Sequence, residues 1–316
     1  MKKLLVVGPD NKTGFRKHLE ELTFCYNGPS KFFKITSSGD RQLPDIISEK
    51  PDLTIIGGRN WIKRNSHVLD EISGKKALLL AGPLGQNEIS EIEIRNLVHF
   101  LCLLDEGRYD YLLTGCPRLA ARLARPDVLY MPAPFSGTYD YSPQKRNLDG
   151  KISILNDNAP HKNTLNSIGG IALSQLTKTF TVNGLPDEHL ELVCRFGLSS
   201  KMRNVGMLEE CAYYQEIRNS KLMLHLSYSE GLCYGVMEAF YNFTPVLVTN
   251  AMPWFCHPGV CVNDPADHQE IADTIDRILR MDWSSYDLLC KVGRDLAERK
   301  AKENNSIVRK VLISML

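Results

Sequence analysis

Short apolar runs alternate with amphipathic stretches along the first half of the chain. The runs end at Gly, Pro or polar residues, and they are Leu4 to Val7, Leu53 to Ile56, Ala77 to Leu80 and Tyr111 to Thr114. Between them, Phe15 to Leu22 and Ile92 to Leu104 repeat apolar residues at helical spacing. Buried strands that alternate with helices are typical of parallel sheets covered by helices. The first half therefore predicts a doubly wound α/β domain.

A second domain is expected after a linker. The chain has 316 residues, and a single core seldom grows beyond about 250 to 300 residues. The stretch from Pro132 to Asp149 is rich in Pro, Gly, Ser and Tyr, as linkers are. Lys151 to Leu155 then predicts the first strand of a new sheet, and Trp283 to Leu316 predicts a long amphipathic helix.

Two glutamates flank the start of a predicted helix in the second half. The apolar run Leu222 to Leu226 predicts a buried strand, while Val236, Met237 and Phe240 recur afterwards at helical spacing. Glu230 therefore falls in the loop after the strand, and Glu238 falls in the first turns of the helix.

This arrangement suits a nucleotide sugar. A helix N-terminus offers unpaired N–H groups and partial positive charge to phosphate, and Gly231 and Gly235 would let the backbone approach closely. Glu238 could accept hydrogen bonds from ribose hydroxyls, and Glu230 could accept one from the sugar beyond the phosphates. The alternative is a surface loop whose helix merely gains from an N-terminal carboxylate.

The segment from Asn204 to Pro253 resembles the signature region of the retaining, nucleotide-sugar-dependent glycosyltransferases of the GT-B fold, family-four type. The matching pieces, in order, are Val205 to Leu208 for a glycine-containing strand, Ser229-Glu230-Gly231, Glu238-Ala239-Phe240 and Thr244 to Val248. The resemblance implies two Rossmann-like domains facing each other across a cleft. Residues 1–140 would form the acceptor side, residues 141–300 the donor side, and the C-terminal helix 301–316 would cross back to the first domain.

The same resemblance implies roles for individual residues. Pro160-His161-Lys162-Asn163 stands where relatives carry Pro-Arg-Lys-Asn, so Lys162 is expected at the donor phosphates. Lys162 and Glu230 are the expected catalytic residues, and the remaining donor-binding residues are Glu238, Gly231, Leu232, Cys233, Tyr234, His161 and Gly14. This chain departs from the pattern at His161 and at Asp157, where relatives often carry Arg.

The sequence evidence for the acceptor-binding residues is weaker than that for the donor-binding residues. Gly14 lies in a first turn that relatives place near the donor phosphates and the acceptor, although it could simply start a helix. Arg59 and Trp61 replace a region where relatives often carry a His that positions the acceptor. They could bind an anionic or planar acceptor, or they could be an exposed Arg beside a packing Trp.

The resemblance implies a hexosyltransferase that moves a sugar from a nucleoside diphosphate sugar, such as a UDP-sugar, to a hydroxyl acceptor, with retained configuration. Neither a cofactor nor a metal is expected, and no Asp-x-Asp motif lies near a predicted strand end. One alternative keeps the fold and glycosylates a hydroxymethylated base in viral DNA, helped by Arg59, Lys63, Arg64, Arg118, Arg122 and Arg125. Another is a non-catalytic nucleotide-sugar-binding scaffold, supported by His161 and Asp157. An epimerase or phosphorylase could share the architecture.

Charge and cysteine usage indicate the compartment. The net charge of +1 argues against binding nucleic acid through bulk electrostatics. No run of eighteen apolar residues occurs, and the N-terminus turns polar too early for a signal peptide. The nine cysteines are scattered, and Cys102 and Cys194 lie among apolar residues, which predicts reduced thiols and a cytoplasmic protein. Cys256, His257 and Cys261 supply too few ligands to predict zinc.

Overall fold

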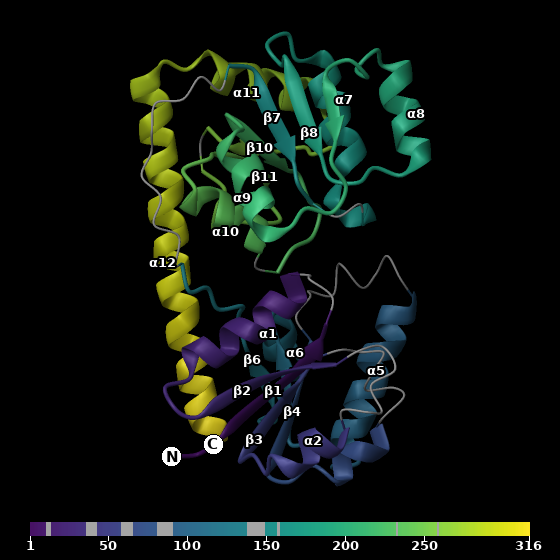
Figure 1. Cartoon of the computed structure of the whole chain (residues 1–316), viewed down its shortest axis with the longest axis vertical. Coiled ribbons are helices and arrows are strands. Elements are labelled where there is room, and N and C mark those ends of the chain that lie inside the picture. Colours follow the sequence, from purple (N-terminus) through teal and green to yellow (C-terminus); the bar gives the residue numbers. More distant parts are fainter. Residues whose placement is uncertain are drawn as a thin grey trace. The chain divides into compact units, whose positions relative to one another are not determined.

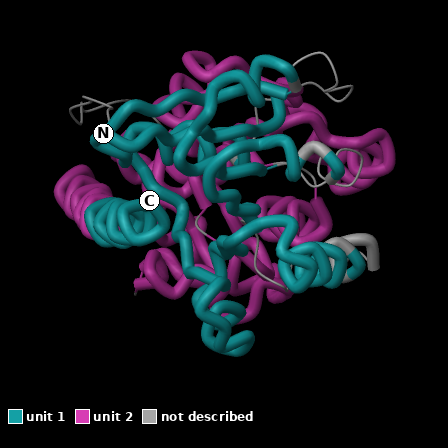
Figure 2. The backbone as a smooth tube through the Cα atoms, turned by 90° about the horizontal axis from the view of Figure 1, so that it is seen from below, with its two compact units in different colours: residues 1–136, 301–316 teal, residues 137–300 magenta. Residues whose placement is uncertain are grey.

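The chain divides into two compact units (Figure 2). The computed structural model describes residues 1–10, 14–35, 43–57, 66–80, 91–137, 149–156, 159–231, 233–257 and 259–316. Unit 1 contains residues 1–136 and 301–316, and unit 2 contains residues 137–300. Each unit holds a six-stranded sheet whose neighbouring strands are all parallel. The predicted α/β class with two doubly wound sheets is confirmed.

The sheet of unit 1 has the strand order β2-β1-β3-β4-β5-β6. Its elements along the chain are β1 Leu4–Pro9, α1 Gly14–Cys25, β2 Ser30–Ile35, α2 Leu43–Ser48, β3 Leu53–Ile56, η2 Ser66–Asp70, β4 Lys75–Leu80, α5 Glu91–Asp105, β5 Tyr111–Thr114, α6 Pro117–Leu123 and β6 Val128–Tyr130 (Figure 1).

Successive side chains of these strands enter two separate cores, because a strand points alternate residues to opposite faces. Leu5 and Val7 join the core under α2, α5 and α6. Leu4 and Val6 join the core formed with α1 and with residues 308–315 of the last helix. The interior strands are thus buried on both faces, which explains why they read as continuous apolar runs.

Unit 2 has the strand order β12-β11-β10-β7-β8-β9. Its elements are β7 Lys151–Ile154, η3 Pro160–Lys162, α7 Thr164–Leu173, β8 Thr179–Val182, α8 Asp187–Arg195, β9 Met202–Asn204, α9 Glu210–Arg218, β10 Leu222–His225, α10 Tyr234–Tyr241, β11 Val246–Thr249, β12 Cys261–Val262, α11 His268–Arg280 and α12 Trp283–Met315. The prediction of a strand at residues 205–208 is wrong. The strand ends at Asn204, and Gly206 adopts a left-handed φ of 63° that is incompatible with a strand.

The order of connections changes direction between β7 and β10. Strands β8 and β9 follow β7 on one side, while β11 and β12 follow β10 on the other. The two central strands pair directly, with Leu222 opposite Ile152. Open α/β sheets commonly bind ligands at such a switch point, outside the carboxyl ends of the strands.

Helix α12 belongs to both units. Its residues up to Lys300 are assigned to unit 2 and those from Ala301 to unit 1. Tyr286 and Leu289 are buried near its start, and Leu312 and Met315 are buried near its end. Within the part of the chain that the structure describes, no helix has the length and apolar composition needed to cross a membrane.

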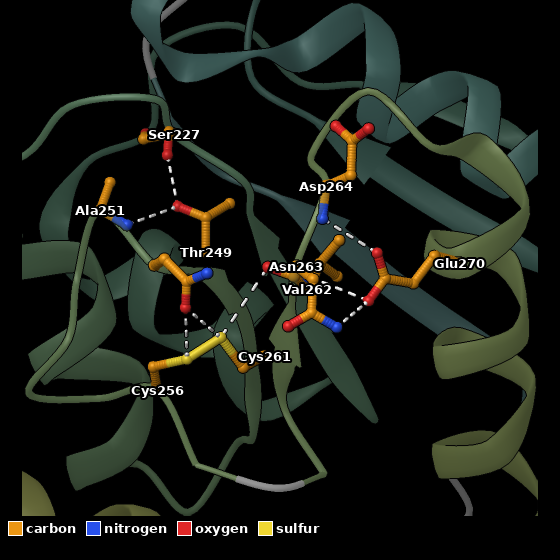
Figure 3. Close-up of a disulfide and its surroundings, with 10 residues drawn as sticks. Ser227, Thr249, Ala251, Cys256, Cys261, Val262, Asn263, Asp264 and Glu270 are labelled. Atoms are coloured by element: carbon orange, nitrogen blue, oxygen red, sulfur yellow. Dashed lines mark hydrogen bonds between the residues drawn. A yellow bond between two sulfur atoms is a disulfide. The ribbon is translucent and has the colours of Figure 1, made fainter.

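A disulfide joins Cys256, in the loop before β12, to Cys261, the first residue of β12 (Figure 3). The Cα atoms lie 5.0 Å apart, and the amide oxygen of Asn250 lies 3.3 and 3.4 Å from the two sulfurs. The prediction of reduced thiols is therefore wrong at these two positions, because the loop folds back and brings them together. Cys102 on α5 and Cys194 on α8, which were expected in apolar surroundings, are both exposed.

Candidate active site

The switch point of unit 2 brings the two predicted catalytic residues into contact. Lys162 ends η3, which follows β7, and Glu230 lies in the loop that follows β10. Lys162 Nζ donates to Glu230 Oε1 at 2.5 Å, and the two side chains are 13% and 4% exposed. Two loops separated by 68 positions in sequence thus share one buried ion pair.

Hydrogen bonds fix the lysine-bearing loop against the glutamate-bearing loop. The Tyr228 amide donates to the carbonyl oxygen of His161 at 2.8 Å. Asn166 Nδ2 donates to the Tyr228 hydroxyl at 2.8 Å and to Asn163 Oδ1 at 2.6 Å. Asn163 has a left-handed φ of 57°, so η3 ends directly after Lys162. These contacts position Lys162 before any ligand binds.

His225 is a third member of the site, and it was not predicted. It ends β10, its exposed fraction is 2%, and its Nε2 lies 2.9 Å from Glu230 Oε1. Because Leu224 faces the core under α7 and α11, the strand's alternation directs His225 to the other face. Cys233 Sγ lies 3.2 Å and Ser227 Oγ 3.1 Å from the same nitrogen. The available signal was a polar residue inside the otherwise apolar run Leu222 to Leu226.

The charges of this cluster support one another. Burial opposes ionisation of Glu230, but the hydrogen bond from His225 and the Lys162 ammonium hold the pKa of the Glu230 carboxyl well below its ordinary value. Burial also disfavours a charged His225, but contacts with the Cys233 sulfur and the Glu230 carboxylate raise the pKa of the imidazole above its ordinary value. Glu230 is consequently an anion held by two donors.

Glu238 lies on α10, eight positions after Glu230, as the helical spacing predicted. Its exposed fraction is 6%, and the Tyr214 hydroxyl on α9 lies 3.2 Å from its Oε1. The same hydroxyl lies 2.8 Å from Glu210 Oε1. The single hydroxyl proton of Tyr214 thus lies between two carboxylates, of which Glu210 is the closer, and sequence reasoning did not foresee this contact.

Three of the other predicted donor-binding residues lie at the start of α10 or just before it. Cys233 precedes the helix, Tyr234 begins it, and both are buried, while Gly231 is half-buried. Gly14 begins α1 of unit 1. Leu232, the predicted acceptor residues Arg59 and Trp61, and Asp157 lie outside the described residues.

The basic strip proposed for a DNA acceptor is only partly described. Arg118 and Arg122 are exposed on α6. Arg125 is bound to Asp105 and Asp127, so its charge is largely neutralised. Arg59, Lys63 and Arg64 lie outside the described residues.

Among the described residues, His225, Glu230 and Cys233 form a group that could hold a metal ion. One ligand atom from each lies within 4.8 Å of the other two. Cys256 and Cys261, the pair considered from the sequence, are instead joined to each other.

No protein-family model matches the chain, and neither does any curated protein sequence. Solved structures, in contrast, do match the chain. Crystal structures of Anabaena HepE in complex with UDP and glucose, and of sucrose-phosphate synthase from Thermosynechococcus elongatus, superpose with TM-scores of 0.77 and 0.72 at 14% identity. The lipopolysaccharide outer core galactosyltransferase WaaB gives 0.62 at 12% identity. Each match covers 99% of this chain and 100% of the other. This likeness shows that the chain has the GT-B fold, with two Rossmann-like domains.

Proposed function

We propose that this protein is a hexosyltransferase that moves a sugar from a nucleoside diphosphate sugar to a hydroxyl acceptor with retained configuration. One observation carries the proposal: Lys162 and Glu230 meet at the switch point of a Rossmann-like sheet, and helix α10 starts four residues after Glu230. This is where open α/β sheets bind nucleotides, with the phosphates at a helix N-terminus.

Each residue of the site would have a different role toward the donor. Glu238 would accept hydrogen bonds from the ribose hydroxyls, beside the Tyr214 hydroxyl. Lys162 and the backbone N–H groups of residues 231–234 would stabilise the charge that develops on the leaving diphosphate. Glu230 would hold the transferred sugar, and Lys162 would turn from Glu230 toward the phosphate as the donor enters.

The donor class is proposed from chemistry and from the structural neighbours. HepE is described in complexes with UDP and with UDP-glucose, so a UDP-sugar is the first donor to test. The acceptor is proposed as a saccharide hydroxyl. Neither a cofactor nor a metal is required by this scheme, because the diphosphate is already an activated leaving group and Lys162 supplies a cation.

Binding and turnover test the proposal separately. Isothermal titration with UDP-glucose, UDP-galactose and UDP-N-acetylglucosamine should show one binding donor, which is hydrolysed slowly without acceptor. Glu238→Ala should weaken donor binding by about tenfold or more, because two hydrogen bonds to a charged group are lost. Lys162→Ala should lower kcat by about a hundredfold with a smaller change in KM.

Matched substitutions away from the site are the controls. Glu191 and Lys178 are exposed on unit 2, so Glu191→Ala and Lys178→Ala should leave both parameters unchanged. Wild-type kinetics in the two site variants would refute the placement of the donor. Donor binding without hydrolysis or transfer to any acceptor tried would favour a non-catalytic scaffold.

A further inference from the structure

The Nε2 atom of His225 has more polar neighbours than one ring nitrogen can bind. Glu230 Oε1 lies at 2.9 Å, Ser227 Oγ at 3.1 Å and Cys233 Sγ at 3.2 Å. An imidazole nitrogen either donates or accepts one hydrogen bond, according to its protonation. An oxygen, a nitrogen and a sulfur that converge in this way form the kind of group that a cation can bind simultaneously.

The ligand types and distances suit a thiophilic divalent ion. Imidazole nitrogen, carboxylate oxygen and thiolate sulfur are all ordinary zinc ligands, whereas Mg²⁺ and Ca²⁺ prefer oxygen alone. Tetrahedral zinc separates its ligand atoms by about 3.4 to 3.6 Å. The observed separations of 2.9 and 3.2 Å therefore require outward shifts of about half an ångström.

The three candidate ligands are all buried. His225 is 2% exposed, the Glu230 side chain 4% and Cys233 7%. Ions bound in such dry sites keep few waters, and three protein ligands with one open position are the usual arrangement of a reactive zinc site. Ser227 Oγ, at 3.1 Å from the shared nitrogen, is a further oxygen beside the three ligands.

Lys162 would compete with such an ion for the Glu230 carboxylate. Its ammonium occupies Glu230 Oε1 at 2.5 Å, and two cations cannot share that oxygen without strong repulsion. We propose that His225, Glu230 and Cys233 form a binding site for a thiophilic divalent cation such as Zn²⁺. As the ion binds, His225 Nε2 and the Cys233 thiol each release a proton to solvent, and the Lys162 ammonium leaves Glu230. The effect of the ion rests on the proposed function. The ion inhibits sugar transfer, because it binds the Glu230 carboxylate that would hold the sugar and repels the Lys162 ammonium.

Cobalt titration of the full-length protein tests the site without any sugar donor. Anaerobic, metal-free protein should bind one Co²⁺ and develop a thiolate-to-cobalt charge-transfer band, which zinc then removes. Cys233→Ser should abolish the band, and His225→Gln should weaken cobalt binding by about tenfold or more. Cys211→Ser, which alters an exposed cysteine on α9, should keep the band.

Lys162→Met provides a test that does not depend on losing a ligand. Removing the competing ammonium should tighten cobalt binding by about tenfold or more. Circular dichroism would verify that each variant is folded. The site is refuted if wild-type protein shows no charge-transfer band, if the band survives in Cys233→Ser, or if Lys162→Met binds cobalt no more tightly than wild type.

Turnover separates this inference from the proposed function. Donor hydrolysis by metal-free protein should fall in proportion to zinc occupancy, and a chelator should restore it. Cobalt binding in a protein that never hydrolyses a nucleotide sugar would leave the ion site standing and refute the transferase. Hydrolysis that is unaffected by stoichiometric zinc would refute the inhibitory role.

Discussion

His18 should make unit 1 sensitive to mild acid. It lies on α1 with an exposed fraction of 2%, and its Nε2 has no hydrogen-bond partner among the described residues. Burial lowers the pKa of the imidazole from 6.5 to about 3. Below pH 6.5, His18 therefore binds a proton in the unfolded chain but stays neutral in the folded chain. The free energy of unfolding falls as the pH falls and levels off below about pH 3.

The size of the effect follows from the two pKa values of His18. Between them, the free energy of unfolding falls by about 1.4 kcal/mol per pH unit. From pH 7.5 to pH 5 the loss due to His18 is about 2 kcal/mol, because the unfolded value of 6.5 lies within this interval and the folded value does not.

Comparison with non-titrating variants isolates this contribution. Urea unfolding followed by circular dichroism at both pH values should show wild type losing about 2 kcal/mol more than His18→Leu. His18→Gln, which keeps a polar atom without titrating, should behave as His18→Leu does. If the difference between wild type and both variants is the same at pH 7.5 and pH 5, the assignment of a buried, neutral His18 is wrong.

Two further substitutions test packing in unit 2. Asp276→Ala removes the acceptor of three hydrogen bonds from residues 174–176, and urea unfolding should show a loss of about 3 kcal/mol. Asp273→Ala, an exposed change on the same helix, should cost less than about 0.5 kcal/mol, and an equal loss in both would contradict the role of Asp276. Gly170→Ala places a Cβ 2.2 Å from Ile271 Cγ2. It should lower the unfolding free energy by about 1 to 3 kcal/mol, and an unchanged denaturation midpoint would show that α7 and α11 are packed less closely.

Local pattern predicted most elements of the sheets. Leu53–Ile56 and Tyr111–Thr114 form strands with the predicted bounds, because both faces of these central strands are buried. Strand β2, Ser30–Ile35, gave no such signal. It is an edge strand whose Lys31 and Lys34 interrupt the apolar run, and much of it is exposed.

The positions of the two glutamates were also determined locally. Glu230 in a loop and Glu238 in a helix follow from the change in apolar spacing around Ser229 to Phe240, and the structure confirms both placements. Their roles toward a donor remain predictions. The disulfide between Cys256 and Cys261 was missed, because a spacing of five residues closes only where the loop folds back.

The sequence by itself determined the class of fold, the parallel sheets and the helix that follows Glu230, because periodicity and turn residues act over a few positions. Only the tertiary structure decided that Lys162, His225 and Cys233 converge on Glu230. That convergence depends on β7 and β10 being neighbours in the sheet. The order of strands in a sheet depends on how the crossover connections pack apolar surface over the whole unit. Local periodicity in the sequence does not contain this information.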